Sequence, residues 1–380
     1  MLDLIIKNGQ CYIDGKLEDK DIAVKEGKIR KIGKISEEAK EVYDAKNQTV
    51  LPGCIDTQTH FREPGSTDTE DLHSGSRAAV AGGITAVFEM PNTNPPTSNI
   101  KEFQRKLDLA KKRMYCNYAF YFGATADNVN QLAELKDLEG CCGIKLFAGS
   151  STGNLLVADE KDIDKVFENC SKVVAVHSED EEVLNKNKKL IKNGDVHSHP
   201  IWRSEECAMS STRRIVRLAE KHNKKAHVLH ITTKQEIDFL SQHKGNITFE
   251  ITPQHLTIYA PDCYDKLGTY TQMNPPIRDK SHYDRLWYAV KNNLNDTIGS
   301  DHAPHLKANK DKKYPNSPSG MPGVQTFMPV MLNHVNDGKL SLTQLINLVC
   351  ENPVKIFGIQ NKGFIKEGYD PAILDEIKQD

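Results

Sequence analysis

The first residues that could do chemistry lie in the segment Leu51-Pro-Gly-Cys-Ile-Asp-Thr-Gln-Thr-His-Phe-Arg-Glu-Pro-Gly65, which begins with a short apolar run and ends at a turn signal. If residues 54–62 form a strand, its alternation places Gln58, His60 and Arg62 on one face. That face would present an amide, an imidazole and a guanidinium at the carboxyl end of the strand. A single histidine at a strand end is usually a solvated polar residue, but later predicted strands end in the same way.

Further polar residues follow the same rule of position. Asn92 follows the second predicted strand, Lys145 lies in the fourth, His177 ends the fifth, His230 lies in the sixth, and Asp301 follows the eighth. Because the carboxyl ends of parallel barrel strands meet on one face, a single rule brings all these side chains to one place. His177 and His230 could each be a buried histidine whose ring nitrogens are simply hydrogen-bonded. The whole group of polar residues at the strand ends is what favours a functional site.

Lys145 lies in the apolar segment Cys141-Cys-Gly-Ile-Lys-Leu-Phe147, which should be buried. A buried lysine is costly unless it is paired or modified. It could extend its amine to water at the strand end, form a Schiff base, or carry a carbamate that turns the amine into a metal-binding carboxylate. Histidines on the neighbouring strands favour the carbamate.

Asp301, in Gly299-Ser-Asp-His-Ala-Pro-His305, is the strongest single acid, because a carboxylate there can bind a metal and also transfer a proton. Three imidazoles, one carboxylate and one carbamate would suit one or two Zn²⁺ ions. A metal-bound hydroxide would then attack an amide-like carbonyl.

Arg62, Asn92 and His305 would surround this metal centre. Arginine is the natural bidentate partner of a carboxylate, so we expect a substrate with a carboxylate next to a hydrolysable C–N bond. The loop Pro318-Ser-Gly-Met-Pro-Gly323 is either a structural turn or a source of backbone groups for the substrate.

The remaining histidines are expected to have no chemical role. His197 and His199 resemble a metal pair but precede Pro200 in a polar loop, so we expect them to be solvated. The others of this kind, in predicted helices or polar loops, are His222, His243, His282 and His334.

The elements that position these residues alternate between strand and helix from about residue 50 to 350. The predicted strands are Val50 to Gln58, Thr85 to Met90, Tyr115 to Phe122, Gly143 to Phe147, Val173 to His177, His227 to Ile231, Ile247 to Ile251 and Thr297 to Ser300. The predicted helices are Asp71 to Ala81, Ile100 to Arg113, Val129 to Leu138, Lys161 to Asn169, Glu205 to His222, Lys234 to His243 and Tyr283 to Asn293. Eight such units predict an α/β fold of the TIM-type (β/α)8 barrel class over residues 51–355. A doubly wound sheet is the alternative, but no GxGxxG opens the first helix.

The two ends of the chain differ from the barrel region. Residues 1–50 read as short strands broken by turns such as Asn8-Gly9 and Asp14-Gly15, and residues 356–380 begin another β segment. We therefore expect a small β-sandwich domain built from the N-terminal segment and a short C-terminal tail. The sequence stops soon after Gly368-Tyr-Asp370, so we expect this domain to be truncated.

Composition limits the partners. The formal net charge of -2 gives no global field that favours nucleic acid or an anionic membrane. No run of about 18 apolar residues predicts a membrane span. Nine cysteines without a CxxC motif or regular spacing suit a reduced, cytoplasmic location.

These motifs resemble the class I-like dihydroorotase family of the amidohydrolase superfamily. The matching pieces, in the family's order, are Asp56 to Gly65, Glu89 to Asn92, Gly143 to Phe147, Ser150 to Asn154, Val176-His177, His227 to His230, Asn274 to Pro276, Asp301 to His305 and Ser319 to Gly323. In this family His-x-Arg-Glu-Pro-Gly together with Asp-His-Ala-Pro-His separates dihydroorotases from hydantoinases and allantoinases.

The resemblance implies reversible interconversion of L-dihydroorotate and N-carbamoyl-L-aspartate in pyrimidine biosynthesis. It assigns His60 and Asp301 to a first metal and His177 and His230 to a second, with carbamylated Lys145 bridging them and Asp301 as general acid/base. It assigns the substrate carboxylate to Arg62, Asn92 and His305, and the pyrimidine ring to Asn274, Ser319 and Gly320.

One departure concerns the metal. The family usually has His-x-His where this chain has Gln58 and His60, and an amide oxygen is a weaker zinc ligand than an imidazole. We therefore expect Gln58 to be a weak or absent ligand, with one or two zinc ions per subunit.

Two other functions stay open. One is a non-catalytic, dihydroorotase-like subunit that scaffolds aspartate transcarbamoylase, and the other is a related cyclic amidase of the hydantoinase or dihydropyrimidinase type. The expected partners are the small-molecule substrate, a second copy of the chain in a homodimer and, under the scaffold hypothesis, aspartate transcarbamoylase.

Overall fold

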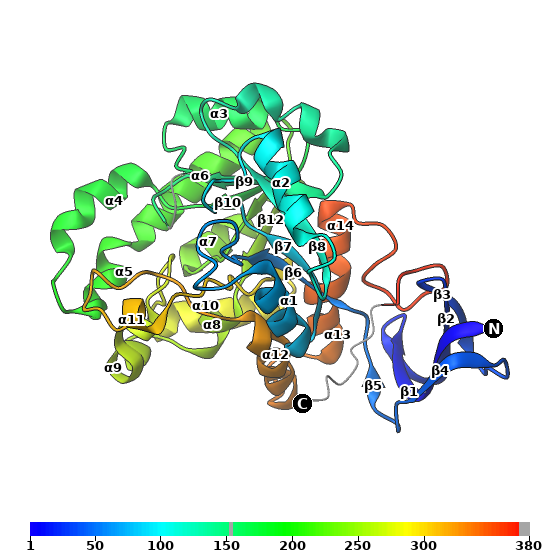
Figure 1. The fold of residues 1–380 in the computed structure, drawn as a ribbon. Coiled ribbons are helices and arrows are strands. Elements are labelled where there is room, and N and C mark those ends of the chain that lie inside the picture. The colour runs from blue at the N-terminus through cyan, green and yellow to red at the C-terminus, as the bar shows by residue number, and fades with distance from the viewer. Residues whose placement is uncertain (152–154, 372–380) are drawn as a thin grey trace.

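A barrel of eight parallel strands forms the centre of the computed structural model, which describes residues 1–151 and 155–371 (Figure 1). Each strand pairs with its neighbours in chain order. The strands are β6 (Cys54–Thr59), β7 (Ile84–Glu89), β8 (Asn117–Gly123), β9 (Cys141–Phe147), β10 (Val174–His177), β11 (Ala226–Val228), β12 (Ile247–Ile251) and β13 (Thr297–Ile298). The backbone N–H of His60 donates to the carbonyl of His302 at 2.8 Å, which joins the first strand's exit to the last and nearly closes the ring. The predicted barrel is confirmed.

The strands are buried on both faces, as in parallel sheets covered by helices. The outer helices are amphipathic, and several begin with a side-chain cap, such as Asp71 before α1 and Thr233 before α7. They are α1 (Leu72–Ala81), α2 (Ile100–Ala110), α3 (Glu160–Asn169), α6 (Glu205–Lys221), α7 (Lys234–Leu240), α10 (Lys280–Lys291), α12 (Phe327–Asn336), α13 (Leu342–Ile346) and α14 (Asn352–Phe357).

Long connections after β10, β12 and β13 form a lobe at one side of the barrel (Figure 1). The lobe carries α4 (Glu181–Asn187), α5 (His199–Trp202), α8 (Pro253–Thr257), α9 (Asp262–Leu267) and α11 (Lys307–Lys310). It has an apolar cluster of its own that includes Cys263, Tyr264, Met273 and Tyr314. These connections leave the carboxyl ends of the strands, where barrel enzymes bind their substrates.

The N-terminal residues form a separate five-stranded sheet beside the barrel (Figure 1). The order is β3-β2-β1-β4, and β5 also pairs with β1. The strands are β1 (Leu2–Ile13), β2 (Lys16–Lys25), β3 (Lys28–Gly33), β4 (Ala39–Asp44) and β5 (Thr49–Val50). The tail returns to this sheet, where Gly368 N–H donates to Ile29 O and Ile29 N–H to Tyr369 O, both at 2.8 Å. A second packed sheet is not seen among the described residues, so the sandwich and the domain boundaries stay predictions.

Two predicted elements differ from the structure. Residues 129–138 form two short 3₁₀-helices, η1 (Val129–Gln131) and η2 (Glu134–Asp137), in place of the predicted α-helix. The buried residues Val129, Leu132 and Leu135 recur every three positions, the period of a 3₁₀-helix. The predicted strand through Arg62 ends at Thr59, because the chain leaves the sheet there and Arg62 takes a φ of 56°.

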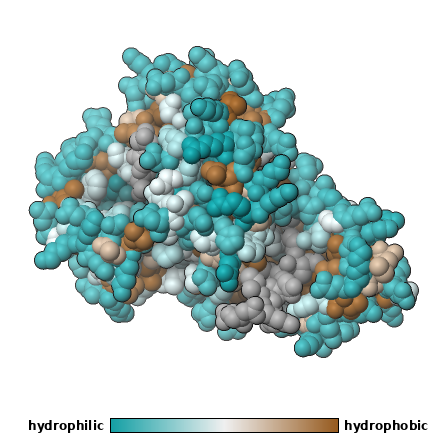
Figure 2. All heavy atoms as spheres, in the orientation of Figure 1, coloured by the Kyte–Doolittle hydropathy of each residue, from teal (hydrophilic) through white to brown (hydrophobic). Residues whose placement is uncertain are grey.

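Polar side chains cover most of the face seen in Figure 2, and the apolar ones form small separate patches. Within the described ranges, no helix has the length and apolar character that a bilayer crossing requires.

Candidate active site

A cavity in the barrel collects the predicted residues. Its lining consists of Gln58, His60, Arg62, Asn92, Lys145, Phe147, Ser151, His177, His230, Asn274, Asp301, Ala303, Ser319 and Gly320. His305 is absent from this lining but lies 3.4 Å from a terminal nitrogen of Arg62. The strand-end rule therefore brings these side chains together, although their chemical roles stay predictions. Of the quoted segment Ser150 to Asn154, residues 152–154 lie outside the described part of the chain.

His60 and Asp301 form one pair of metal-type donors. His60 Nε2 lies 3.3 Å from Asp301 Oδ1, and His60 Nδ1 lies 2.8 Å from Asn92 Oδ1. An amide oxygen can only accept, so Nδ1 carries the proton and Nε2 keeps its lone pair toward Asp301. Gln58 Nε2 donates to the same carboxylate oxygen at 2.9 Å, which leaves the buried Gln58 Oε1 without a partner among the described residues.

His177 and His230 form a second pair. His177 Nδ1 and His230 Nε2 are 3.0 Å apart, close to the roughly 3.3 Å that separates two nitrogens on one tetrahedral zinc. The other nitrogen of His177 lies 2.9 Å from Glu179 Oε2. Burial lowers the pKa of His230 and of His60 well below the usual range, so both imidazoles are neutral, as metal ligands must be.

Lys145 lines the same cavity as both donor pairs. Its side chain is buried, and no described carboxylate lies within ion-pair distance of Nζ, which sits 4.6 Å from the centre of the Phe147 ring. Burial lowers the pKa of Lys145 and raises that of Asp301, while the field of each opposes the shift of the other. A neutral amine is the form that adds carbon dioxide, so this environment suits a carbamate.

Three site residues have backbone conformations that ordinary residues avoid. The φ angles are 56° at Arg62, 39° at His230 and 45° at Asp301. Such conformations cost of order 1–3 kcal/mol each and concentrate at functional sites. The surrounding barrel therefore holds these side chains in place at some expense of stability.

The donor set fits a divalent metal such as zinc. As the side chains lie, no three or more His, Cys, Asp or Glu residues of the described chain are gathered around one point. Two donor pairs nevertheless face one cavity with Lys145, and Gln58 Oε1 is a buried acceptor that a cation would satisfy. Imidazole and carboxylate are the donors zinc prefers.

Arg62 is the cation of the cavity. Its Nε donates to Pro304 O at 3.0 Å, and no described carboxylate lies within ion-pair distance of the guanidinium. His305 Nε2 donates to Ser319 O at 2.9 Å, and burial lowers the pKa of His305 to about 4, which keeps it neutral. Gly320 has a φ of 143°, and a Cβ there would lie 2.5 Å from Ala303 O, so only glycine allows this loop to approach.

Several residues around the cavity were missed by sequence reasoning. Glu179 and Arg203 form a buried ion pair behind His177. Burial acts to raise the pKa of Glu179, but Arg203 and His177 outweigh it and lower the value to about 2. Glu250 is buried beside Thr57, and its charge acts on both Lys145 and Asp301. The one feature of the sequence that could have indicated this ion pair was the position of Glu179, two residues after His177.

The prediction that His199 is solvated is wrong. His199 is buried, with Nε2 2.9 Å from Met273 O and 3.1 Å from Asn274 Oδ1, so it supports a cavity residue. It is buried because α5 packs into the apolar cluster of the lobe, where His199 contacts the rings of Trp202 and Tyr314. His197 is partly exposed to solvent, as predicted, and pairs with Asp265.

Comparison with known proteins identifies the family of the chain. The model of the Amidohydrolase family matches residues 49–374. A dihydroorotase of Methanosarcina acetivorans is 34% identical over 98% of this chain and 83% of its own length, and a dihydroorotase of Pyrococcus furiosus is 32% identical over 98% and 82%. An L-hydantoinase (dihydropyrimidinase) structure from Arthrobacter aurescens superposes with a TM-score of 0.93 at 29% identity, over 98% of this chain and 86% of that one. The chain belongs to the amidohydrolase family.

Proposed function

We propose that the chain is a dihydroorotase, which interconverts L-dihydroorotate and N-carbamoyl-L-aspartate. The observation that carries this proposal is Arg62, a buried guanidinium in the cavity with no described carboxylate within ion-pair distance. A substrate carboxylate would supply the missing anion in bidentate form. The dihydroorotases among the relatives support the same substrate.

Zinc, held by His60 and Asp301, by His177 and His230, and by a carbamate on Lys145, is the cofactor we propose. When bound, it polarises the scissile carbonyl and lowers the pKa of a water molecule. Gln58 is the weakest candidate ligand, because its amide nitrogen is already bonded to Asp301.

Asp301 is the group that moves the proton in this proposal. Its Oδ1 accepts a hydrogen bond from Gln58 Nε2, while no hydrogen bond among the described residues holds Oδ2. In hydrolysis Oδ2 accepts a proton from the attacking water. It then returns that proton to the ring nitrogen as the C–N bond breaks, so the carboxylate is regenerated.

The polar groups around Asp301 orient the ring. Arg62, with Asn92 and His305 beside it, holds the carboxylate, and Asn274 and the Ser319-Gly320 backbone face the other edge. This orientation fixes which ring carbonyl meets the water.

A hydantoinase activity is the second candidate, and the 0.93 TM-score to an L-hydantoinase structure favours it. Hydantoin and dihydrouracil carry no carboxylate for Arg62. A non-catalytic scaffold for aspartate transcarbamoylase is a third candidate, but a scaffold has no need of the convergent donor pairs.

The test is a turnover assay with L-dihydroorotate, hydantoin and dihydrouracil, each with and without added Zn²⁺. We expect turnover of dihydroorotate alone, and an Arg62→Met variant should lose at least 100-fold in kcat/KM, about 3 kcal/mol of transition-state binding. Preference for the uncharged rings would establish the hydantoinase, and no turnover at any zinc concentration would favour the scaffold.

The assembly and location of the protein are further parts of the proposal. We propose a cytoplasmic location, since a reduced compartment suits nine free cysteines. A homodimer is the assembly we propose. Light scattering of the purified protein, alone and with an aspartate transcarbamoylase, tests both kinds of partner, and a strictly monomeric protein would contradict the dimer.

A further inference from the structure

A buried ion pair stands directly behind His177. Glu179 is fully buried and Arg203 is 4% exposed, and Arg203 NH1 donates to Glu179 Oε2. The same oxygen lies 2.9 Å from His177 Nε2. A carboxylate paired with a guanidinium accepts hydrogen bonds and donates none, so the ring proton of His177 sits on Nε2 and the lone pair on Nδ1.

Arg203 also joins the exits of two neighbouring strands. Its NH2 donates to Ser150 O at 2.7 Å, and its guanidinium stacks on Trp202 at 4.7 Å. Gly149 allows this close approach, because a Cβ there would lie 2.4 Å from Glu179 O. These contacts fix two connections against each other. One follows β9, the strand that carries Lys145, and the other follows β10, the strand that ends at His177.

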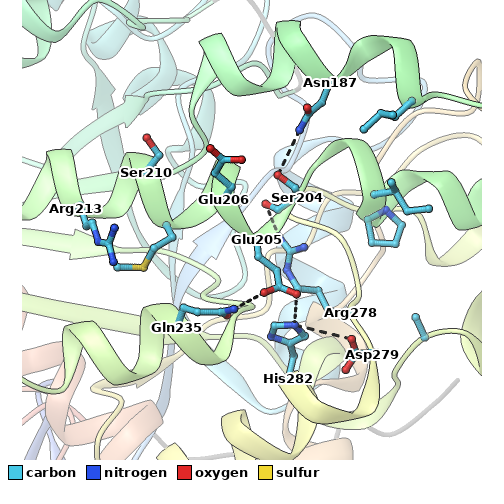
Figure 3. A pocket seen from close by; sticks show the side chains of 15 residues that line it. Asn187, Ser204, Glu205, Glu206, Ser210, Arg213, Gln235, Arg278, Asp279 and His282 are labelled. Carbon is cyan, nitrogen blue, oxygen red and sulfur yellow. Dashed lines mark hydrogen bonds and ion pairs between the residues drawn. The ribbon is translucent and has the colours of Figure 1, made fainter.

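A second arginine holds Arg203 from the other side. Arg278 is buried and donates from Nε to Thr232 Oγ1 at 2.9 Å, from NH1 to Arg203 O at 3.1 Å and from NH2 to Ser204 O at 3.4 Å. It lines a large pocket on the outer flank of the barrel, beside Glu205 and His282 (Figure 3). Continuous contacts therefore run from this outer pocket through Arg278, Arg203 and Glu179 to His177.

We propose that Glu179 and Arg203 are positioning residues, which set the tautomer and ring orientation of His177 so that Nδ1 faces His230 inside the cavity, and that Arg278 supports them. Partners of this kind typically change metal affinity 10- to 100-fold when they are removed. Only the expected change in metal affinity rests on the proposed metal-dependent function. The tautomer of His177 can be measured in the metal-free protein.

The first measurement needs neither metal nor activity. In metal-free protein labelled with ¹⁵N-histidine, the His177 signals are identified by their loss in a His177→Gln variant. We expect the tautomer with the proton on Nε2 in the wild type and a mixture of tautomers in Glu179→Ala. A wild-type His177 protonated on Nδ1, or the same tautomer in both proteins, would overturn the proposal whether or not the chain is a hydrolase.

The second measurement separates positioning from simple stabilisation. Zinc dissociation constants are determined by competition with a chromogenic chelator, alongside urea unfolding of the metal-free proteins. We expect Glu179→Gln and Arg203→Met to bind zinc 10- to 100-fold more weakly, and Arg278→Met to lose less. If these variants lose stability and keep wild-type zinc affinity, the pair is structural and the proposal fails.

Two neighbouring arginines provide matched controls. Arg214 pairs with Asp180, the residue after Glu179, and Arg213 lines the outer pocket without a contact to Arg203 in the described structure. We expect Arg214→Met and Arg213→Met to keep the His177 tautomer and the zinc affinity of the wild type. A tenfold loss of zinc affinity in either control would show that the effect is not specific to the pair.

Discussion

Gln58 is the residue that decides how strongly the first donor pair holds a metal. Its amide nitrogen is bonded to Asp301 while its oxygen is buried without a partner, so as a ligand it would have to give up or rearrange that bond. We predict at most one tightly held zinc per wild-type chain and a second in Gln58→His, because imidazole is the better zinc ligand. Metal analysis after purification without added zinc measures both.

The control for that experiment is Gln360→His, which adds an imidazole at an exposed position where the native amide donates to Gly358 O and pairs with no described carboxylate. It should hold no more zinc than the wild type. Two tightly held zinc ions in the wild type would show that the amide is an adequate ligand and would contradict the prediction.

Lys145 gives a second prediction at this scale. A buried amine with a lowered pKa should carry carbon dioxide where neither a carboxylate nor a carbonyl of the described residues engages it, as at Lys145 and in contrast to Lys310. Native mass spectrometry in bicarbonate buffer should find one such adduct per chain in the wild type and none in Lys145→Met. Lys310 is the matched control, since it is also buried and burial lowers its pKa to about 8. Persistence of the adduct in Lys145→Met, or its loss in Lys310→Met, would contradict the assignment.

The sequence predicted the residues that line the cavity better than it predicted the residues that hold them in place. Lys145, His177, His230 and Asp301 follow from strand position alone, because parallel strands deliver their ends to one face. Arg203 comes from a connection whose path is fixed by tertiary packing, so no local pattern pairs it with Glu179.

Among the elements, helix α11 links the two loops expected to meet the substrate. Lys310, its last residue, donates from Nζ to Gln272 O at 3.2 Å and to Pro318 O at 2.9 Å. Gln272 in turn donates from Nε2 to Ser319 Oγ at 3.1 Å. The loop of Asn274 and the loop of Gly320 are also bonded directly, from Gly320 N–H to Gln272 O at 2.9 Å, and Lys310 adds a second link between them.

We predict that Lys310→Met raises KM for dihydroorotate about tenfold and leaves the zinc content unchanged. The loss of the link loosens both loops, which costs about 1.4 kcal/mol of substrate binding, while the metal donors lie on other elements. Steady-state kinetics and metal analysis check the two parts. Lys307→Met, on the exposed side of the same helix, is the control and should behave as the wild type. A fall in zinc content with unchanged KM would refute this account.

The helices were predicted well where the apolar period is 3.6, as in α6 (Glu205–Lys221). The prediction failed at residues 129–138, where the buried residues recur every three positions, the period of a 3₁₀-helix. The predicted strand Val50 to Gln58 ends one residue before β6 does, and the strand considered over residues 54–62 is three residues too long, because the ladder ends at Thr59.

At the scale of the whole molecule, the eightfold alternation of strand and helix was sufficient to predict the barrel. It was not sufficient for the lobe, whose apolar cluster joins residues from three separate connections, from Val196 to Tyr314. The lobe is also where buried histidines such as His199 and His255 were not foreseen.

These buried histidines predict how the stability of the whole molecule depends on pH. Burial lowers the pKa of His255 to about 4, against an unfolded value of about 6.5. Above pH 6.5 the imidazole is neutral in both states. As the pH falls from 6.5 to 4, only the unfolded chain takes up the proton, so stability is lost at up to about 1.4 kcal/mol per pH unit and by about 3 kcal/mol in total. His305, with a pKa of about 4, acts in the same direction.

Urea unfolding of the metal-free protein at pH 7, 6 and 5 measures this histidine contribution as a fall in the free energy of unfolding toward acid, which the buried carboxyls of Asp56 and Glu89, with pKa values raised to about 7, oppose. His255→Gln should make that fall shallower, because it removes one of the groups that only the unfolded chain protonates. Leu256→Val, a buried neighbour without a titrating group, should lower the free energy equally at every pH and keep the wild-type slope. If the free energy of unfolding of His255→Gln depends on pH as in the wild type, the His255 imidazole is protonated in the folded protein. The interior of the lobe would then be less completely buried than its contacts indicate.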